Sequence, residues 1–175
     1  MIRRRFGKRA FGRPIRYAAV RGLLGTAHSV RRAKPFIREK FLLLYGDDVF
    51  GAGGLRRLVR HDWALLVWRV EHPKRWRVVV TDEEGCVVKL IEKPCALVSD
   101  LTWTGAAVFQ PELFHFDTAP YRRSEDEYEE VPDLFCAAVG QGVKLKTVIA
   151  DLWLRGNTPE QIEAAAAELR RRAET

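Results

Sequence analysis

Two pairs of charged residues directly follow apolar runs of the chain. Asp47 and Asp48 come after the run FLLLY at 41–45, and Glu92 and Lys93 come after VVKLI. In open α/β sheets, ligands bind where strands end, and Mg²⁺ accepts one or two carboxylates together with phosphate oxygens. The spacing therefore predicts a ligand site at both places, with a hard cation at the first. A plain turn at 47–48, and a strand end stopped by proline at 94, remain open as alternatives.

The elements that must position these residues alternate along the chain. The run at 41–45 is typical of a strand buried on both faces, and Thr158-Pro159 marks the start of the clearest helix. The alternation predicts an α/β fold with a mainly parallel sheet and one local hairpin. Strands are expected at 14–17, 41–45, 63–70, 104–109 and 143–154, the hairpin at 78–94, and helices at 26–34, 55–60, 131–142 and 158–172, with a short one opening at Pro111.

Length and composition narrow the class of protein. The 175 residues, 47% hydrophobic and 30% charged, suit one globular domain over 1–175. No apolar run approaches the roughly 18 residues of a membrane helix, and the charged N-terminus lacks the apolar run of a secretory signal, so a cytoplasmic protein is expected. The three cysteines and four histidines have no zinc-ligand spacing, which argues against a zinc site.

Positive charge is concentrated at the N-terminus. Residues 1–40 hold 13 lysines and arginines against one acid, Glu39, within a chain of net charge +7. Such a segment could form a nucleic-acid patch, a solvated arm, or a surface for polyphosphate or an acidic partner. No aromatic-interleaved RNA motif or helix-turn-helix pattern accompanies it, so nucleic acid is the weaker interpretation. Residues 1–14 are expected to form a basic arm.

Six segments, in order along the chain, resemble the sugar-1-phosphate nucleotidylyltransferases. That resemblance implies a partial Rossmann-like nucleotidyltransferase fold. It also implies a Mg²⁺-assisted transferase of sugar nucleotide biosynthesis, which makes a nucleoside diphosphate sugar and pyrophosphate from a nucleoside triphosphate and a sugar 1-phosphate. Glucose with UTP or dTTP is the expected pair. The segments are LGTAHSV (24–30), FLLLYGDDVF (41–50), residues 64–94, TWTGAAVFQPELF (102–114), DEYEEVPDLF (126–135) and LWLRGNTPEQI (152–162).

The resemblance also implies roles for individual residues. The turn Gly25-Thr26-Ala27 matches the one beside the nucleotide base. Asp47 stands at the position of a Mg²⁺-binding aspartate, Glu92 at that of an acid that binds sugar hydroxyls, and Lys93 at that of a lysine near the sugar phosphate. Asp47 and Lys93 are thus the expected catalytic residues. Thr104-Gly105 matches a turn that closes on the sugar.

Three departures from the family pattern set further expectations. The opening strand and Gly-rich loop are not found, so the chain is expected to lack the first βαβ units and to make little sugar nucleotide alone. A homo-oligomer is expected, or else a partner chain that supplies the missing N-terminal half. Arg155 stands where the family has a second metal-binding aspartate, and Arg77 where it usually has glycine. The alternatives are a non-catalytic or regulatory subunit that binds a partner chain or a sugar nucleotide, and a basic nucleic-acid-associated protein.

Overall fold

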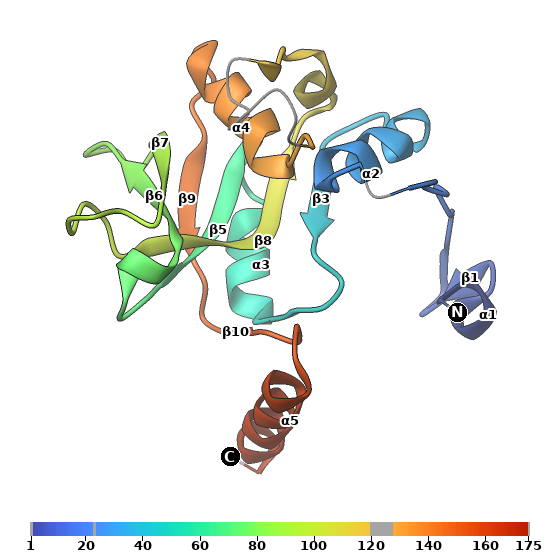
Figure 1. Cartoon of the computed structure of the whole chain (residues 1–175). Helices are drawn as coiled ribbons and strands as arrows, with labels where there is room; N and C mark the ends of the chain where they lie inside the picture. The colour runs from blue at the N-terminus through green and yellow to red at the C-terminus, as the bar shows by residue number, and fades with distance from the viewer. Residues whose placement is uncertain (1, 23, 120–127, 175) are drawn as a thin grey trace. The chain divides into compact units, whose positions relative to one another are not determined.

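The computed structural model describes residues 2–22, 24–119 and 128–174 (Figure 1). These residues divide into two compact units. The first unit is Met1–Glu39 with Pro111–Gln141, and the second unit is Lys40–Gln110 with Gly142–Thr175. The expectation of one domain over the whole chain stays a prediction. In the described part of the chain, no helix is both long enough and apolar enough to cross a membrane.

The second unit is built on a mixed sheet of six strands. Strand β8 pairs antiparallel with β3, β5 and β6, whereas β5 and β9 are parallel. Strands β3, β5, β6 and β9 consequently run in one direction. The predicted α/β fold is confirmed. The sheet is mainly parallel in the direction of its strands, although among neighbouring strands only β5 and β9 of the described residues pair in parallel. The strands are β3 (Phe41–Leu44), β5 (Ala64–Arg69), β6 (Arg77–Thr81), β7 (Val87–Glu92), β8 (Leu101–Phe109) and β9 (Lys146–Ile149).

The antiparallel register brings distant strand ends to one level of the sheet. Ile91 pairs with Val78, Val78 with Thr102, and Thr102 with Trp68 near the end of β5. Strand β3 pairs with β8 up to Leu44. The end of the hairpin, the end of β5 and the turn after β3 are therefore all gathered around the first half of β8.

One face of this sheet carries helix α3 (Ala52–Leu58). Leu58 on the helix, Leu66 on β5 and Val108 on β8 belong to one buried cluster. The Asp151 carboxylate lies at the N-terminus of α3 and accepts a hydrogen bond from the backbone N–H of Gly54. Glycine gives this carboxylate room, because a Cβ on Gly54 would lie 2.7 Å from it and one of the two would have to shift.

Asp151 also explains why the predicted strand at 143–154 is wrong. The chain leaves the sheet after β9, turns at Asp151, and resumes as β10 (Trp153–Leu154), which pairs with β4 (Val49–Phe50). The 3-10 helix η2 (Pro73–Arg75) connects β5 to the hairpin.

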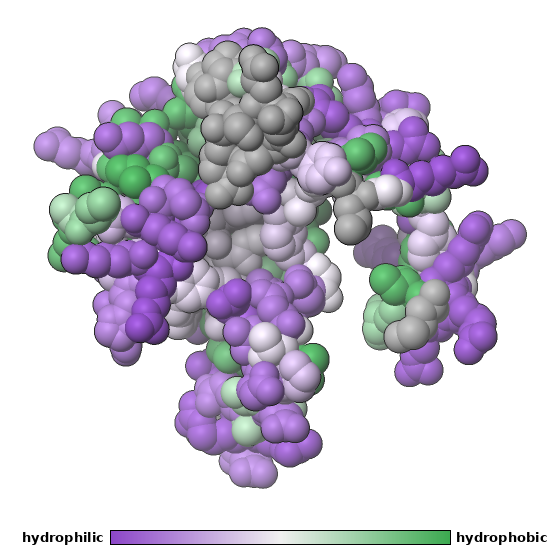
Figure 2. Space-filling model, viewed as in Figure 1, coloured by the Kyte–Doolittle hydropathy of each residue, from purple (hydrophilic) through white to green (hydrophobic). Residues whose placement is uncertain are grey.

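Helix α5 (Pro159–Ala173) follows β10, and the predicted cap is confirmed, since the Thr158 hydroxyl accepts from the Gln161 backbone N–H. The helix extends away from β10 (Figure 1). Ala165 is the only buried residue of α5. Hydrophilic residues cover most of the face that this helix shows at the bottom of Figure 2.

Strand β3 is more exposed than its apolar run suggests. Leu43 is buried, but Leu42 and Leu44 are 39% and 44% exposed, so the prediction of burial on both faces is wrong. Among the described residues β3 pairs only with β8, and its second edge has no strand beside it. An edge strand alternates in burial even when every residue in it is apolar.

The first unit packs helices around a small apolar core. Val131, Leu134 and Phe135 of α4 are buried, as is Ala27 of α2. Arg31 binds the carboxylate of Glu129 through two nitrogens, at 2.6 and 2.9 Å. The expected helices at 26–34 and 131–142 are confirmed. The elements here are α2 (Thr26–Ala33), η1 (Lys34–Phe36), η3 (Pro111–His115) and α4 (Val131–Gly140).

The expected basic arm at 1–14 has regular structure. It contains α1 (Ile2–Phe6) and a short hairpin of β1 (Arg9–Ala10) and β2 (Arg13–Pro14). The predicted strand at 14–17 is wrong, because the ladder ends at Pro14. Proline lacks an N–H group and favours strand ends.

Candidate active site

The turn after β3 meets the turn after β10 in the second unit. With its amide oriented to satisfy both atoms, Asn157 donates to Asp47 Oδ2 at 2.8 Å and accepts from Arg155 Nη2 at 2.8 Å. The Trp153 indole N–H donates to Asp48 Oδ2 at 2.9 Å. A Cβ on Gly156 would lie 2.2 Å from the carbonyl oxygen of Asp47, so glycine allows the two turns to meet. Asp47 and Arg155 thus share one site.

The two aspartates have different surroundings. Asp47 is exposed, whereas Asp48 is half-buried, and its Oδ1 atom has no partner within the described part of the chain. Burial raises the pKa of the Asp48 carboxyl, and the neighbouring charge of Asp47 adds to this, although the Trp153 hydrogen bond acts in the opposite direction. Asp48 is therefore a structural acid, and Asp47 is the carboxylate that solvent and ligands can reach.

Arg155 lies against two tryptophans. The Trp76 and Trp153 rings meet edge to face, with centroids 5.6 Å apart. The Arg155 guanidinium lies 4.9 Å from the Trp76 centroid and 6.0 Å from that of Trp153. Cation–π attraction of this kind holds a cation in a defined place.

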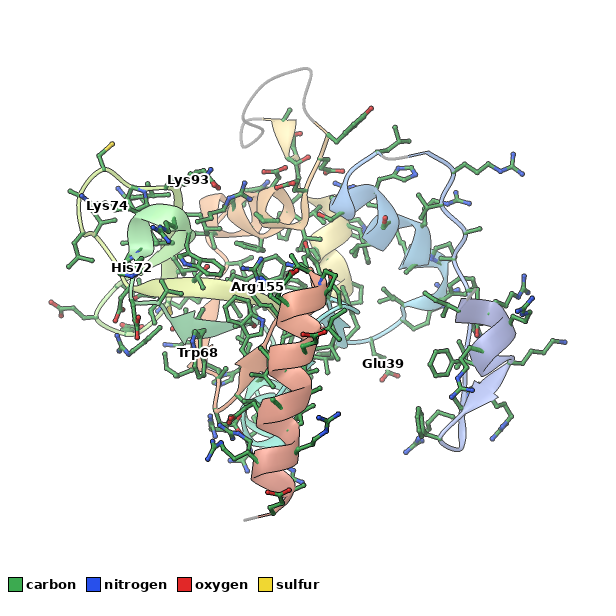
Figure 3. The ribbon with its side chains drawn as sticks, turned by 60° about the horizontal axis from the view of Figure 1, so that its bottom comes forward. Glu39, Trp68, His72, Lys74, Lys93 and Arg155 are labelled. Carbon is green, nitrogen blue, oxygen red and sulfur yellow. The ribbon has the colours of Figure 1, made fainter. Side chains whose placement is uncertain are left out.

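Trp76, Trp153 and Arg155 border a cavity of about 820 Å³, which is large enough for a small-molecule ligand. Figure 3 shows Arg155 just ahead of α5, with Trp68 on β5 and His72 beside η2. The cavity thus lies at the end of β5, where ligands bind in such sheets. Its walls come from Trp68, Arg69, Val70, Glu71, His72, Arg75, Trp76, Trp153 and Arg155.

The end of the hairpin reaches the same tryptophans. The backbone N–H of Lys93 donates to the Trp76 carbonyl at 2.9 Å, and Lys93 adopts a positive φ of 41°. The neighbouring Glu92 carboxylate accepts from Arg77 Nε at 2.7 Å. Trp76 therefore links Glu92 and Lys93 to Arg155, and Arg77 occupies one oxygen of the expected sugar-binding acid.

Thr104 and Gly105 support the site from beneath. The buried Thr104 hydroxyl donates to the Leu66 carbonyl at 2.8 Å, so it joins β8 to β5. Gly105 has a φ of 89°, and a Cβ there would lie 2.9 Å from the Tyr45 ring. Gly105 thus gives room to the Tyr45 ring, and its carbonyl accepts from the Tyr45 N–H at 3.0 Å, two residues before Asp47. The expected contact of Thr104 and Gly105 with the sugar stays a prediction.

The expected base-binding turn lies in the first unit. Gly25 has a φ of 86°, and a Cβ there would lie 2.2 Å from the Glu129 carbonyl oxygen. The same oxygen accepts from the Ala27 N–H at 3.2 Å, and the Thr26 hydroxyl accepts from the Val131 N–H at 3.0 Å. Gly25 and Thr26 border a cavity of about 540 Å³ in this unit.

The residues around Asp47 and Arg155 do not by themselves fit Mg²⁺. Among the described residues, no group of three or more His, Cys, Asp or Glu side chains could hold a metal ion. Asp47 is the one expected ligand that is a carboxylate. The neighbouring Asp48 faces Trp153, and the position of the second expected ligand holds the Arg155 guanidinium, which only donates hydrogen bonds. Mg²⁺ binding by this chain stays a prediction.

Trp76, Trp153 and Asn157 were missed as candidate residues. Trp76 precedes Arg77, and the other two flank Arg155, so each stands near a departure from the family pattern. A turn with polar residues directly after a strand was the signal that could have identified Asn157.

Comparison with known proteins gives consistent relatives. The sequence profile of the Nucleotidyl transferase family matches residues 1–169. A UTP–glucose-1-phosphate uridylyltransferase of Haloferax volcanii, AglF, is 34% identical in an alignment of 151 positions, and the match covers 81% of this chain and 61% of that protein. A glucose-1-phosphate thymidylyltransferase of Streptomyces griseus is 30% identical in an alignment of 162 positions, and the match covers 87% of this chain and 45% of that protein. The chain thus spans less than two thirds of these relatives.

Solved structures agree on the fold. A Bacillus anthracis protein described as a glucose-1-phosphate thymidylyltransferase, crystallised with sucrose, superposes with a TM-score of 0.73 at 19% identity, covering 91% of this chain and 67% of that one. The inositol-1-phosphate CTP transferase of T. maritima gives 0.65 at 22% identity, covering 83% and 61%.

Proposed function

We propose that this chain, which belongs to the nucleotidyl transferase family, takes part in the synthesis of a nucleoside diphosphate sugar. The substrates would be a nucleoside triphosphate and a sugar 1-phosphate, and pyrophosphate would be released. Glucose 1-phosphate with UTP or dTTP is the first pair to test, because the named relatives use glucose 1-phosphate and transfer uridylyl or thymidylyl groups.

The observation that supports this proposal is the cavity beside Trp76, Trp153 and Arg155. Its tryptophans offer apolar surfaces against which a sugar ring can pack, and its arginines suit a phosphate. Asp47 is connected to Arg155 through Asn157. A sugar phosphate bound here would have its phosphate near Arg155, with the hairpin end at Lys93 nearby.

The chemistry requires positioning and charge neutralisation. An anionic oxygen of the sugar phosphate bonds to the α-phosphorus, and the bond to the leaving pyrophosphate breaks with its electron pair. No general base is needed, because the attacking oxygen is already ionised. Arg155 and Lys93 would offset the phosphate charge, and Glu92 would orient the sugar through its hydroxyls while Arg77 holds the carboxylate in place.

We also propose that a partner chain or a second copy adds a strand to the edge of β3 that no strand of the described residues occupies. The exposed Leu42 and Leu44 would be covered by such an addition, and unpaired strand edges commonly associate in this way.

Since nucleoside triphosphates are made inside cells, the proposed reaction agrees with the cytoplasmic location expected from the sequence.

Calorimetric titration with UDP-glucose and dTDP-glucose, in the presence of Mg²⁺, tests the function. We expect saturable binding of at least one product, weakened by Glu92→Gln. Glu83→Gln is the matched control, because Glu83 is an exposed residue in the turn of the same hairpin, and it should leave affinity unchanged. Absence of binding for both nucleotide sugars would contradict the proposal.

Pyrophosphate release from UTP or dTTP with glucose 1-phosphate tests the separate prediction that this chain alone makes little product. Turnover of about 1–10³ s⁻¹, the usual enzymatic range, would support the function and show that prediction to be wrong.

A further inference from the structure

Arg155 is held in place without an acidic ion-pair partner. In residues 2–22, 24–119 and 128–174, its guanidinium contacts the Trp76 and Trp153 rings and the Asn157 amide, and no ion pair within 4.0 Å involves it. Burial raises the pKa of the Asp48 carboxyl, and the nearby charge of Arg155 opposes this, but that carboxylate faces the Trp153 indole. The positive charge of Arg155 is thus positioned by neutral groups.

The charges around the cavity favour an anion. Three arginines and His72 border it, against one carboxylate, Glu71. Arg69 is neutralised by Asp100, with contacts of 2.6 and 2.7 Å. Arg75 and Arg155 form no ion pair with any described residue. Two unneutralised guanidinium groups therefore border the same cavity, one of them fixed against tryptophan.

We propose that Arg155 binds the phosphate group of the sugar phosphate directly, so that this chain binds its sugar phosphate without a divalent cation. The inference rests on the proposed function and specifies how that site recognises its substrate. A guanidinium presents two parallel N–H donors to a phosphate, whereas it cannot coordinate Mg²⁺. Arg155 would thus perform by hydrogen bonding what a metal-bridged carboxylate does by coordination.

The position of Arg155 suits this role. One nitrogen, Nη2, is used by Asn157, which leaves further N–H donors of the fork for a ligand. Stacking on Trp76 restricts the side chain before the ligand arrives, and this lowers the entropy lost on binding. Asp47, at the other end of Asn157, fixes the orientation of the amide.

The test is a titration of glucose 1-phosphate followed by tryptophan fluorescence, in buffer with EDTA and in buffer with Mg²⁺. All five tryptophans belong to the second unit, and two of them contact Arg155. We expect dissociation constants that agree within about twofold between the two buffers. Inorganic phosphate should compete, and glucose should not, because the phosphate group carries the recognition.

Variants separate this proposal from a structural role for Arg155. Arg155→Ala should weaken binding about tenfold or more, as expected for a lost charged hydrogen bond, and Arg155→Lys should be intermediate. Arg56→Ala, which removes an exposed arginine of α3, is the control and should have no effect. Arg155→Asp should make binding dependent on Mg²⁺. Urea unfolding of each variant checks that it is folded.

Binding that requires Mg²⁺ in the wild-type protein, or unchanged affinity in folded Arg155→Ala, would overturn the inference and leave the proposed function standing. Failure to bind glucose 1-phosphate in either buffer, together with failure to bind the nucleotide sugars, would overturn both.

Discussion

Gly156 is the point at which a single methyl group should disturb the candidate site. A Cβ there would lie 2.2 Å from the Asp47 carbonyl oxygen, and ordinary contact requires the two turns to separate by about 1 Å. That shift would break the 2.8 Å contact between Asn157 and Asp47 and the 2.9 Å contact between Trp153 and Asp48, because a hydrogen bond does not survive such lengthening.

The expected cost of Gly156→Ala is about 1–3 kcal/mol, as for other overpacked sites, and losing two hydrogen bonds at about 0.5–1.5 kcal/mol each gives a similar figure. Urea unfolding followed by tryptophan fluorescence should show a midpoint lower by about 1 M. Glucose 1-phosphate affinity should fall as well, because Asn157 would no longer hold Arg155.

Gly46→Ala provides the matched control. Gly46 directly precedes Asp47, and a Cβ there would meet no atom within 4 Å. Its φ is not positive, so alanine should change stability by no more than about 0.5 kcal/mol. If the two variants unfold at the same urea concentration, the inference that Gly156 allows the turns to meet is wrong.

Three further variants test the surroundings of the site. Burial raises the pKa of Asp48, so protonation of this carboxyl stabilises the fold, and that stabilisation is lost as pH rises through the folded pKa. Urea unfolding should therefore show that Asp48→Asn is more stable than wild type at pH 7 but not in acid. Burial would raise the pKa of Asp151, but hydrogen bonds from the Gly54 and Gly53 N–H groups and the charge of Arg57 lower it overall. Its stabilisation is therefore present at neutral pH and lost as pH falls through the folded pKa, and Asp151→Asn should be less stable at pH 7, with a difference that vanishes in acid. Thr104→Val should lower the free energy of unfolding by about 1 kcal/mol, measured in the same way.

Patterns within a few neighbouring residues predicted the helices and turns that interactions between neighbouring residues determine. The Thr158 hydroxyl caps the helix that begins at Pro159, and the hairpin at 78–94 turns where its glycine stands, with Gly85 at a φ of 73°. Alternation of elements likewise predicted the α/β class, and the strand-end rule placed a turn with Asp47 after β3.

The remaining features depend on contacts between distant residues. An apolar run such as 41–45 does not reveal that Leu42 and Leu44 belong to an edge strand. The stacking of Arg155 on Trp76 joins residues 79 positions apart, and no pattern in either segment indicates it. The same holds for Asp151, which divides a strand-like segment because it caps a helix 97 positions earlier.

The Asp151 cap has a consequence for the order in which the chain can fold as it is synthesised. When residues 40–110 have been made, α3 still lacks the carboxylate at its N-terminus, and β5 still lacks β9 along one edge. The intervening segment Pro111–Gln141 belongs to the first unit, so it must be made before either arrives. At about 5–20 residues per second, this delay lasts roughly two to eight seconds. During that time the nascent second unit presents an open strand edge to chaperones and to neighbouring chains, so the interleaved order of the two units lengthens its exposure to aggregation.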